Sequence, residues 1–87
     1  MRGLFGKGTI DAKGTIVYVK NDKGFYGVET DDGKRYEPIG LFSDFKEDGM
    51  RAKFKATRLK GPSPHGWGKP IDIFYLERIV KIGKQKP

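Results

Sequence analysis

The sequence has no cysteine, one histidine and one tryptophan. Without cysteine, disulfide bonds, thiolate metal sites and thiol catalysis are excluded, so ordinary burial of side chains must hold the fold together. A single histidine leaves no imidazole partner for a metal site or a proton relay. No apolar run approaches the roughly 18 residues that cross a membrane, and residues 1–9 lack the apolar stretch of a signal peptide. We therefore expect a cytoplasmic protein with no cofactor, no metal and no membrane partner.

The length and composition describe one small folded domain. The chain has 87 residues and a mass of 9.8 kDa, which allows a single hydrophobic core but no second domain. Aromatic residues make up 13% of the chain and charged residues 33%, which is too rich in Phe and Tyr for a disordered segment. We expect residues 1–80 to form one domain and residues 81–87 to form a flexible basic tail.

Basic residues are concentrated in the second half of the chain. Residues 1–48 contain 8 basic and 9 acidic side chains, whereas residues 49–87 contain 10 basic and 2 acidic ones. The net charge of +7 and the isoelectric point near 9.7 therefore arise from the second half. A strongly basic surface attracts polyanions, and composition alone does not distinguish nucleic acid, anionic lipid and an acidic protein.

Turn residues divide the chain into five predicted strands. Residues 21–24 and 31–33 have the Asp, Asn and Gly chemistry of tight turns, and Gly14 is a point where a long first strand can turn a barrel corner. The segment 39–48 breaks the strand alternation and predicts a short helical turn, with Ser43 as its N-cap. The predicted strands are residues 7–20 (one bent strand or two short ones), 25–30, 34–37, 50–57 and 71–80.

Strict alternation over residues 50–57 gives this strand one apolar face and one basic face. The basic face carries Arg51, Lys53 and Lys55, about 7 Å apart because side chains on one face recur at every second residue. The last strand is rich in β-branched and aromatic residues. Simple alternation places Ile71, Ile73 and Tyr75 on one of its faces and Phe74, Leu76 and Val80 on the other.

The order of these elements is that of an OB-fold. Five strands, a helical turn between the third and the fourth, and a long loop before the fifth predict an all-β, five-stranded Greek-key barrel. Such barrels bind oligonucleotides or oligosaccharides on strands 2 and 3 and the neighbouring loops. An SH3-like barrel is the main alternative, although it accommodates the turn between Pro38 and Met50 less well. Residues 24–27, the Asp-Gly turn at 32–33, and residues 67–68 ahead of 70–73 make the chain similar, across most of its length, to small uncharacterised prokaryotic OB-like proteins, which implies a fold and no activity.

Residues 14–25 (Gly-Thr-Ile-Val-Tyr-Val-Lys-Asn-Asp-Lys-Gly-Phe) resemble the opening of a cold-shock domain, a family of OB-folds with an aromatic RNA-binding motif. The resemblance places Tyr18 at the family's stacking Trp and Phe25 at the first Phe of that motif. Gly27 falls on the second Phe, so one stacking platform is missing from the strand. Near the family's second aromatic motif, Tyr36 is the one aromatic residue.

Cations and aromatic rings are the candidate nucleic-acid-binding side chains, because cations hold phosphates and rings stack on bases. Trp67 lies between two glycines of the loop 60–70, where its ring either stacks on a base or folds back onto the barrel. His65, in the same loop, either contacts a phosphate or is an ordinary surface residue. The basic face of residues 50–57 either follows a phosphate backbone or is simply the solvated face of a strand. The remaining candidates are the cations Arg51, Lys53, Lys55, Arg58, Lys60 and Lys69 and the aromatic residues Tyr18, Phe25 and Tyr36.

We therefore expect a non-catalytic module that binds single-stranded DNA or RNA with little sequence preference. The alternative is a protein-interaction module whose basic surface docks onto an acidic protein partner. The acidic pairs at residues 31–32 and 47–48 lie in predicted turns, where Asp makes local hydrogen bonds, so no acid and base pair for catalysis is evident.

Overall fold

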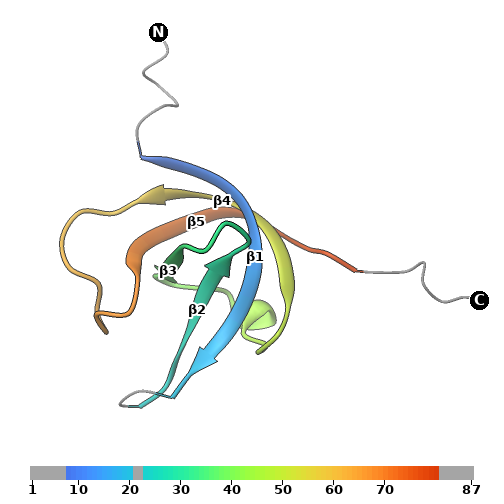
Figure 1. Cartoon of the computed structure of the whole chain (residues 1–87), viewed down its shortest axis with the longest axis horizontal. Helices are drawn as coiled ribbons and strands as arrows, with labels where there is room; N and C mark the ends of the chain where they lie inside the picture. Colours follow the sequence, from blue (N-terminus) through green and yellow to red (C-terminus); the bar gives the residue numbers. More distant parts are fainter. Residues whose placement is uncertain (1–7, 21–22, 81–87) are drawn as a thin grey trace, which may run out of the picture.

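Five strands and one 3-10 turn follow one another along residues 8–20 and 23–80, the part of the chain described by the structure, a computed structural model. The strands pair in the order β1-β2-β3-β5-β4, and β4 pairs again with β1, so the barrel is closed (Figure 1). The all-β, five-stranded, OB-fold-like architecture is confirmed, whereas the predicted tail at residues 81–87 lies outside the described residues. The elements are β1 (Thr9–Val19), β2 (Phe25–Thr30), β3 (Arg35–Pro38), η2 (Ser43–Phe45), β4 (Arg51–Arg58) and β5 (Lys69–Arg78).

β1 turns the corner of the barrel at Gly14. Its residues 14–19 pair with β2 and its residues 9–15 pair with β4, so Gly14 faces a partner on both sides. A Cβ atom at this position would lie 2.5 Å from the carbonyl oxygen of Glu29 and 2.9 Å from the Cα of Thr30. The sharp bend brings these backbones too close for any side chain, which confirms the predicted corner.

The core lies inside the barrel and is built from alternate residues of the strands. On β4, Ala52, Phe54 and Ala56 are buried, and their neighbours point outward, as the sequence predicts. Ile16 of β1 and Ile71 of β5 are fully buried against Phe54. The 3-10 turn lies at one end of this core, where Phe45 packs against it.

The faces predicted for the last strand are wrong beyond Ile73. The register between β4 and β5 shifts at Lys55 and Ala56, which face Tyr75 and Ile73 respectively. Phe74 is therefore an extra, exposed residue in a β-bulge. Leu76 packs against the core instead of Tyr75. A bulge reverses the inward and outward phase of a strand, and simple alternation does not reveal it.

The predicted N-cap of the helical turn is also wrong by one residue. Ser43 is the first residue of the 3-10 turn, and Phe42 occupies the capping position with an extended backbone and no side-chain capping hydrogen bond. A single turn is closed here by backbone bonds, because Phe45 N–H donates to the carbonyl of Phe42 at 2.9 Å.

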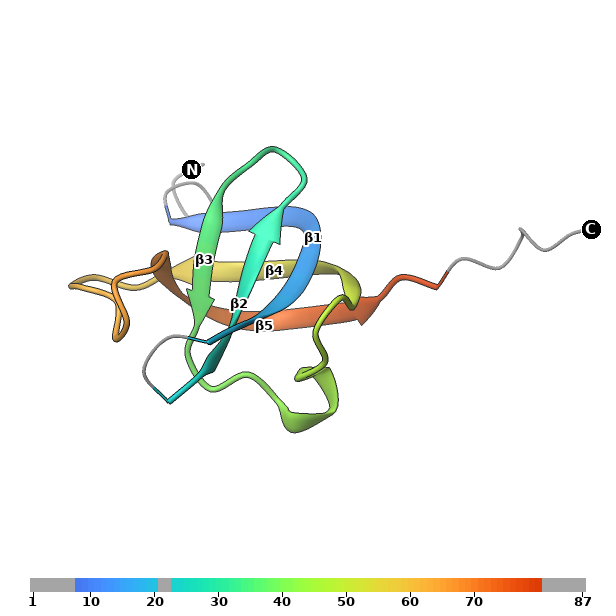
Figure 2. The same ribbon diagram turned by 60° about the horizontal axis from the view of Figure 1, so that its bottom comes forward.

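The barrel separates two outer surfaces. β2 and β3 cross in front of β4 and β5 in Figure 2. β4 pairs with β1 and β5, and β3 meets β5 through a short parallel ladder that places Tyr36 beside Lys69. The outer face of β4 is therefore flanked by β1 and β5, whereas the end of β4, at Arg58, lines a groove together with β3. Within the described residues, no helix is long and apolar enough to cross a membrane.

Candidate functional site

The indole ring of Trp67 lies flat on the outer face of β2. The loop that joins β4 to β5 (residues 59–68, gold and orange at the left of Figure 1) returns toward the sheet at this point. A Cβ atom on Gly27 would lie 2.8 Å from both Cε3 and Cη2 of Trp67, and nearer still to Cζ3 between them. An atom that approached Cζ3 within the ring plane would lie farther from both of its neighbours, so these short distances place Gly27 beneath the ring face. Trp67 is thus partly buried, and the glycine creates the space for it.

Arg35 of β3 packs over the same indole. Its guanidinium carbon lies 5.0 Å from the ring centroid of Trp67, within the range of a cation–π interaction. The Nε atom of Arg35 also lies 3.4 Å from a carboxylate oxygen of Glu29 on β2. Both side chains of this ion pair are about half exposed, so the guanidinium remains accessible from solvent.

Phe25 and His65 form a parallel stack next to Trp67. Their ring centroids are 3.9 Å apart and their planes differ by 4°. Phe25 also meets Trp67 edge to face, at 6.0 Å between centroids. We call these three residues the aromatic cluster. The cluster brings Phe25 of β2 together with His65 and Trp67 of the β4–β5 loop, two segments that are distant in the sequence.

A buried carboxylate holds the loop against β3. Glu37 is 2% exposed, and its two oxygens accept backbone N–H bonds from His65 and Trp67, each at 3.2 Å. The Nδ1 atom of His65 lies 3.6 Å from the same carboxylate. A buried carboxylate is costly unless its oxygens are paired, and the two loop amides supply the partners. The positions of His65 and Trp67 are therefore fixed by β3.

Four cations line a groove beside the aromatic cluster. The groove has a volume of about 240 Å³, and the largely buried Tyr36 also lines it. Arg58 and Lys69 form no ion pair with any described residue, whereas Lys34 lies 3.8 Å from a carboxylate oxygen of Asp32. We call it the cationic groove; its cations are Lys34, Arg35, Arg58 and Lys69.

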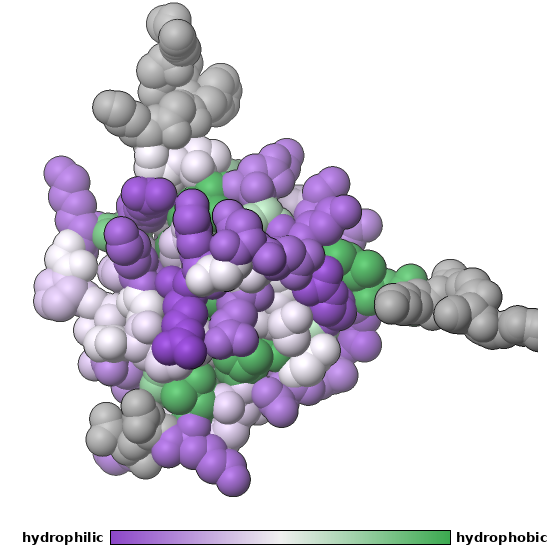
Figure 3. All heavy atoms as spheres, in the orientation of Figure 1, coloured by the Kyte–Doolittle hydropathy of each residue, from purple (hydrophilic) through white to green (hydrophobic). Residues whose placement is uncertain are grey.

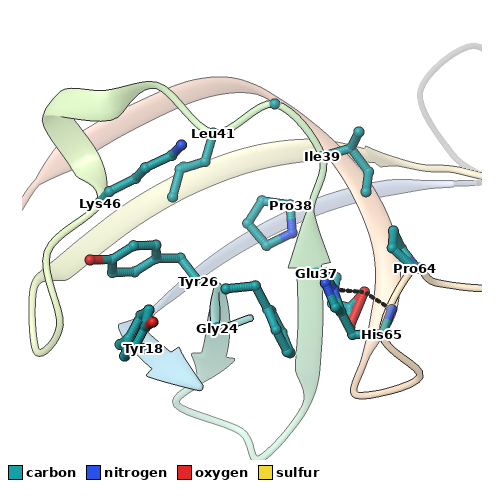
Figure 4. Close-up of a pocket in the computed structure, with 12 residues that line it drawn as sticks. Tyr18, Gly24, Tyr26, Glu37, Pro38, Ile39, Leu41, Lys46, Pro64 and His65 are labelled. Carbon is teal, nitrogen blue, oxygen red and sulfur yellow. Dashed lines mark hydrogen bonds and ion pairs between the residues drawn. The ribbon is translucent and has the colours of Figure 1, made fainter. Parts of the chain in front are cut away.

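A second cavity opens on the other side of Glu37. It has a volume of about 340 Å³ and is bounded by the β1–β2 end, the segment 38–46 and the β4–β5 loop. In Figure 4, Lys46 and Leu41 lie along one edge, with Tyr26 and Tyr18 below them and His65 at the far end. The rings of Tyr18 and Tyr26 are 5.0 Å apart. We call this cavity the aromatic pocket.

The cation row of β4 lies elsewhere. Arg51 donates two hydrogen bonds to the carboxylate of Asp31, at 2.6 and 2.8 Å, and this bonding lowers the pKa of Asp31. The flanking strands interleave further acids with the row, because Asp11 faces Lys55 from β1 and Glu77 faces Lys53 from β5. The structure therefore does not bring this row together with Trp67.

The remaining candidates divide between the two surfaces and the core. Tyr18 is 41% exposed at the aromatic pocket. Tyr36 is 4% exposed and belongs to the core, so its ring has no free face for a base; this corrects the expectation that it stacks. Lys60 is exposed in the β4–β5 loop and lines neither the groove nor the pocket.

Sequence reasoning missed four residues of this surface: Lys34, Arg35, Glu37 and Lys46. They lie in the half of the chain with a net negative charge, where the average charge indicates no basic site. The alternation of the third strand held a signal, because an inward Tyr36 requires Arg35 and Glu37 to take the other face. Glu37 is nonetheless buried because the β4–β5 loop covers it.

No protein-family model, curated protein or solved structure matches this chain. Within the described residues there is also no group of three His, Cys, Asp or Glu side chains arranged to hold a metal ion.

Proposed function

We propose that this protein is a non-catalytic module that binds single-stranded nucleic acid across the outer face of β2 and β3 and the adjoining ends of β4 and β5, which carry Arg58 and Lys69. One observation carries the proposal: the cationic groove opens directly beside the aromatic cluster, and Arg35 belongs to the groove while it packs on Trp67. Single-stranded nucleic acid is bound by this combination, in which cations follow the phosphates and rings accept the bases. Stacking and charge carry little sequence information, so binding has low sequence preference.

The resemblance to cold-shock domains supports the same surface. On that alignment β2 lacks the second stacking Phe and has Gly27 in its place. The indole of Trp67 lies against Gly27, so the loop supplies the aromatic ring that the strand lacks. Phe25, at the position of the first Phe, is the neighbour of that indole.

The assay is titration of a fluorescein-labelled 12-nucleotide single strand at several salt concentrations. The test variant is Arg58→Gln/Lys69→Gln, which removes two cations of the groove. The matched control is Lys53→Gln/Lys55→Gln, which removes the same charge from the exposed face of β4. Both pairs are exposed, so neither variant disturbs the core.

The wild type should bind with an affinity that falls steeply as salt rises, because each phosphate contact releases counterion. In the groove variant the slope of log affinity against log salt should become shallower by about 1.4, since each phosphate contact on a single strand contributes about 0.7 to its steepness. The control should keep the slope of the wild type. Equal losses in the two variants, or an affinity that ignores salt, would contradict the proposed interface.

The alternative function, docking onto an acidic protein, uses the same cations without the rings. Figure 3 shows polar and charged side chains over most of one face of the barrel, with hydrophobic residues in small patches. A nuclease-treated pull-down separates the two functions. Recovery of one stoichiometric acidic protein, with no oligonucleotide binding at low salt, would replace the proposal by this alternative.

A further inference from the structure

The aromatic pocket has the size and the walls of a binding site for one planar group. Its volume of about 340 Å³ falls at the lower end of the range for small-molecule pockets, roughly 300 to 1,000 Å³. Four aromatic rings line it: those of Tyr18, Phe25 and Tyr26, and the imidazole of His65 that stacks on Phe25. Pro38 and Leu41 add apolar surface. A flat, partly apolar ring would therefore find both stacking partners and burial here.

The polar groups of the pocket favour an anionic substituent on that ring. Lys46 is exposed and lies on the rim of the pocket, where it forms no ion pair with any described residue (Figure 4). The carboxylate of Glu37 does not compete for it, because both of its oxygens are occupied by amides of the β4–β5 loop. Lysine binds phosphate as a mobile point charge, so a phosphate linked to the ring through a sugar suits this position.

The pocket also adjoins the cationic groove along one strand. Arg35 lines the groove and Glu37 lines the pocket, so the two sites are two residues apart on β3, roughly 7 Å. The aromatic cluster connects them, since His65 and Phe25 line the pocket and Trp67 contacts Arg35. Neighbouring nucleotides of one strand can therefore occupy both sites at once.

We propose that the aromatic pocket accepts the base of one nucleotide, with the phosphate of that nucleotide at Lys46. The inference rests on the proposed function in one respect, namely that the nucleotide is part of a bound strand. It adds an enclosed site for one base, next to the aromatic cluster of the proposed interface. Tyr18 supplies an exposed ring of this site, and its role is to stack on the base.

The experiment uses the full chain, labelled with ¹⁵N, and free adenosine 5′-monophosphate as the probe. Adenosine and ribose 5-phosphate are the two reference probes, because each lacks one half of the proposed ligand. The backbone amides of Gly24 and Gly40, which border the pocket, report occupation through their NMR chemical shifts. We expect saturable shifts with the nucleotide, weaker binding of adenosine and no shift at these amides with ribose 5-phosphate.

Two variants and one control assign the roles. Lys46→Gln should lower the affinity for the nucleotide to that for adenosine, and it should leave the affinity for adenosine unchanged. Tyr18→Leu should weaken both by at least about 5-fold, because loss of a base stack costs about 1 kcal/mol or more. Lys53→Gln, an exposed lysine on β4, should have no effect on either probe.

The inference is overturned if ribose 5-phosphate binds as tightly as the nucleotide, or if the nucleotide shifts amides of the cationic groove and leaves Gly24 and Gly40 unmoved. Either result leaves the salt-dependent binding of a 12-nucleotide strand intact. Conversely, saturable binding of the nucleotide at the pocket without any binding of the strand would support the site and contradict the proposed function.

Discussion

Substitution of Gly27 by alanine tests the packing that positions the aromatic cluster. The new Cβ would lie 2.8 Å from two ring atoms of Trp67 and nearer to a third, so the indole must leave its place. The backbone of Gly27 itself tolerates alanine, because its φ angle is negative. The substitution therefore acts through the ring and not through backbone strain.

The magnitude follows from the area that the displaced ring loses. A large aromatic side chain buries about 150 to 250 Å², and loss of the contact beneath one ring face exposes about 100 Å² of it. At about 25 cal/mol per Å², this costs about 2.5 kcal/mol. Replacement of a strand glycine by alanine returns about 0.5 to 1 kcal/mol. The net loss of about 1.5 to 2 kcal/mol corresponds to a decrease of roughly 6 to 16 °C in Tm for a domain of this size.

The assay is a double-mutant cycle that combines Gly27→Ala with Trp67→Ala, and the stability of each variant is measured by thermal unfolding. In the wild type, Gly27→Ala should destabilise the fold and shift the emission of the single tryptophan toward that of a solvated indole. In the Trp67→Ala background the same change should stabilise the fold by about 0.5 to 1 kcal/mol, since nothing remains to collide with the methyl group. A destabilisation of the same size in both backgrounds would refute the proposed contact.

Two further substitutions test the electrostatic contacts. Arg51→Gln removes the hydrogen bonds that lower the pKa of Asp31, so the wild type should be the more stable protein above pH 3.8, the ordinary value for Asp. This advantage should decline as the pH falls below 3.8 and Asp31 becomes protonated, which thermal unfolding between pH 2 and 7 would show; a constant difference across that range would contradict it. Glu37→Gln replaces a carboxylate oxygen by an amide donor facing the N–H of His65 or Trp67, at a cost of about 1 to 3 kcal/mol. Hydrogen exchange at these two amides should accelerate, and unchanged protection would show that Glu37 does not hold the loop.

Local patterns were sufficient to predict most of the architecture. The strict alternation of Ala52, Phe54 and Ala56 with charged residues defined β4 and its inner face. Gly14 marked the corner of β1 because a long strand that pairs with two partners must bend at a residue without a side chain. Both features leave a local mark in the sequence, as alternation along 50–57 and as a glycine within a long strand pattern.

Features that depend on distant segments were not predictable in the same way. The bulge at Phe74 is set by the register of β5 against β4, which a single strand does not encode. The packing of Trp67 on Gly27 joins residues 40 positions apart. From the sequence, Gly27 indicated only that the stacking Phe of the cold-shock pattern is missing, and not that the indole of Trp67 fills the space. Sequence reasoning therefore identified Trp67 as a candidate and misjudged its surroundings.

The candidate site shows the same division. The concentration of positive charge after residue 48 drew attention to the row that contains Lys53, whereas the cationic groove takes Arg35 from the acidic half of the chain. Net charge along a sequence is an average over a segment. A binding surface is assembled from individual side chains of different segments, and the closed barrel determines which of them meet.

The position of β5 between β3 and β4 determines when the chain can fold during its synthesis on the ribosome. β5 is the last of the five strands to be synthesised, and it carries Ile71, which is fully buried in the core. Until Arg78 has left the exit tunnel, the nascent chain has two open strand edges and an incomplete interior. The molecule should therefore fold in one late step rather than strand by strand, and a stalled chain that ends before β5 should be degraded quickly by proteases.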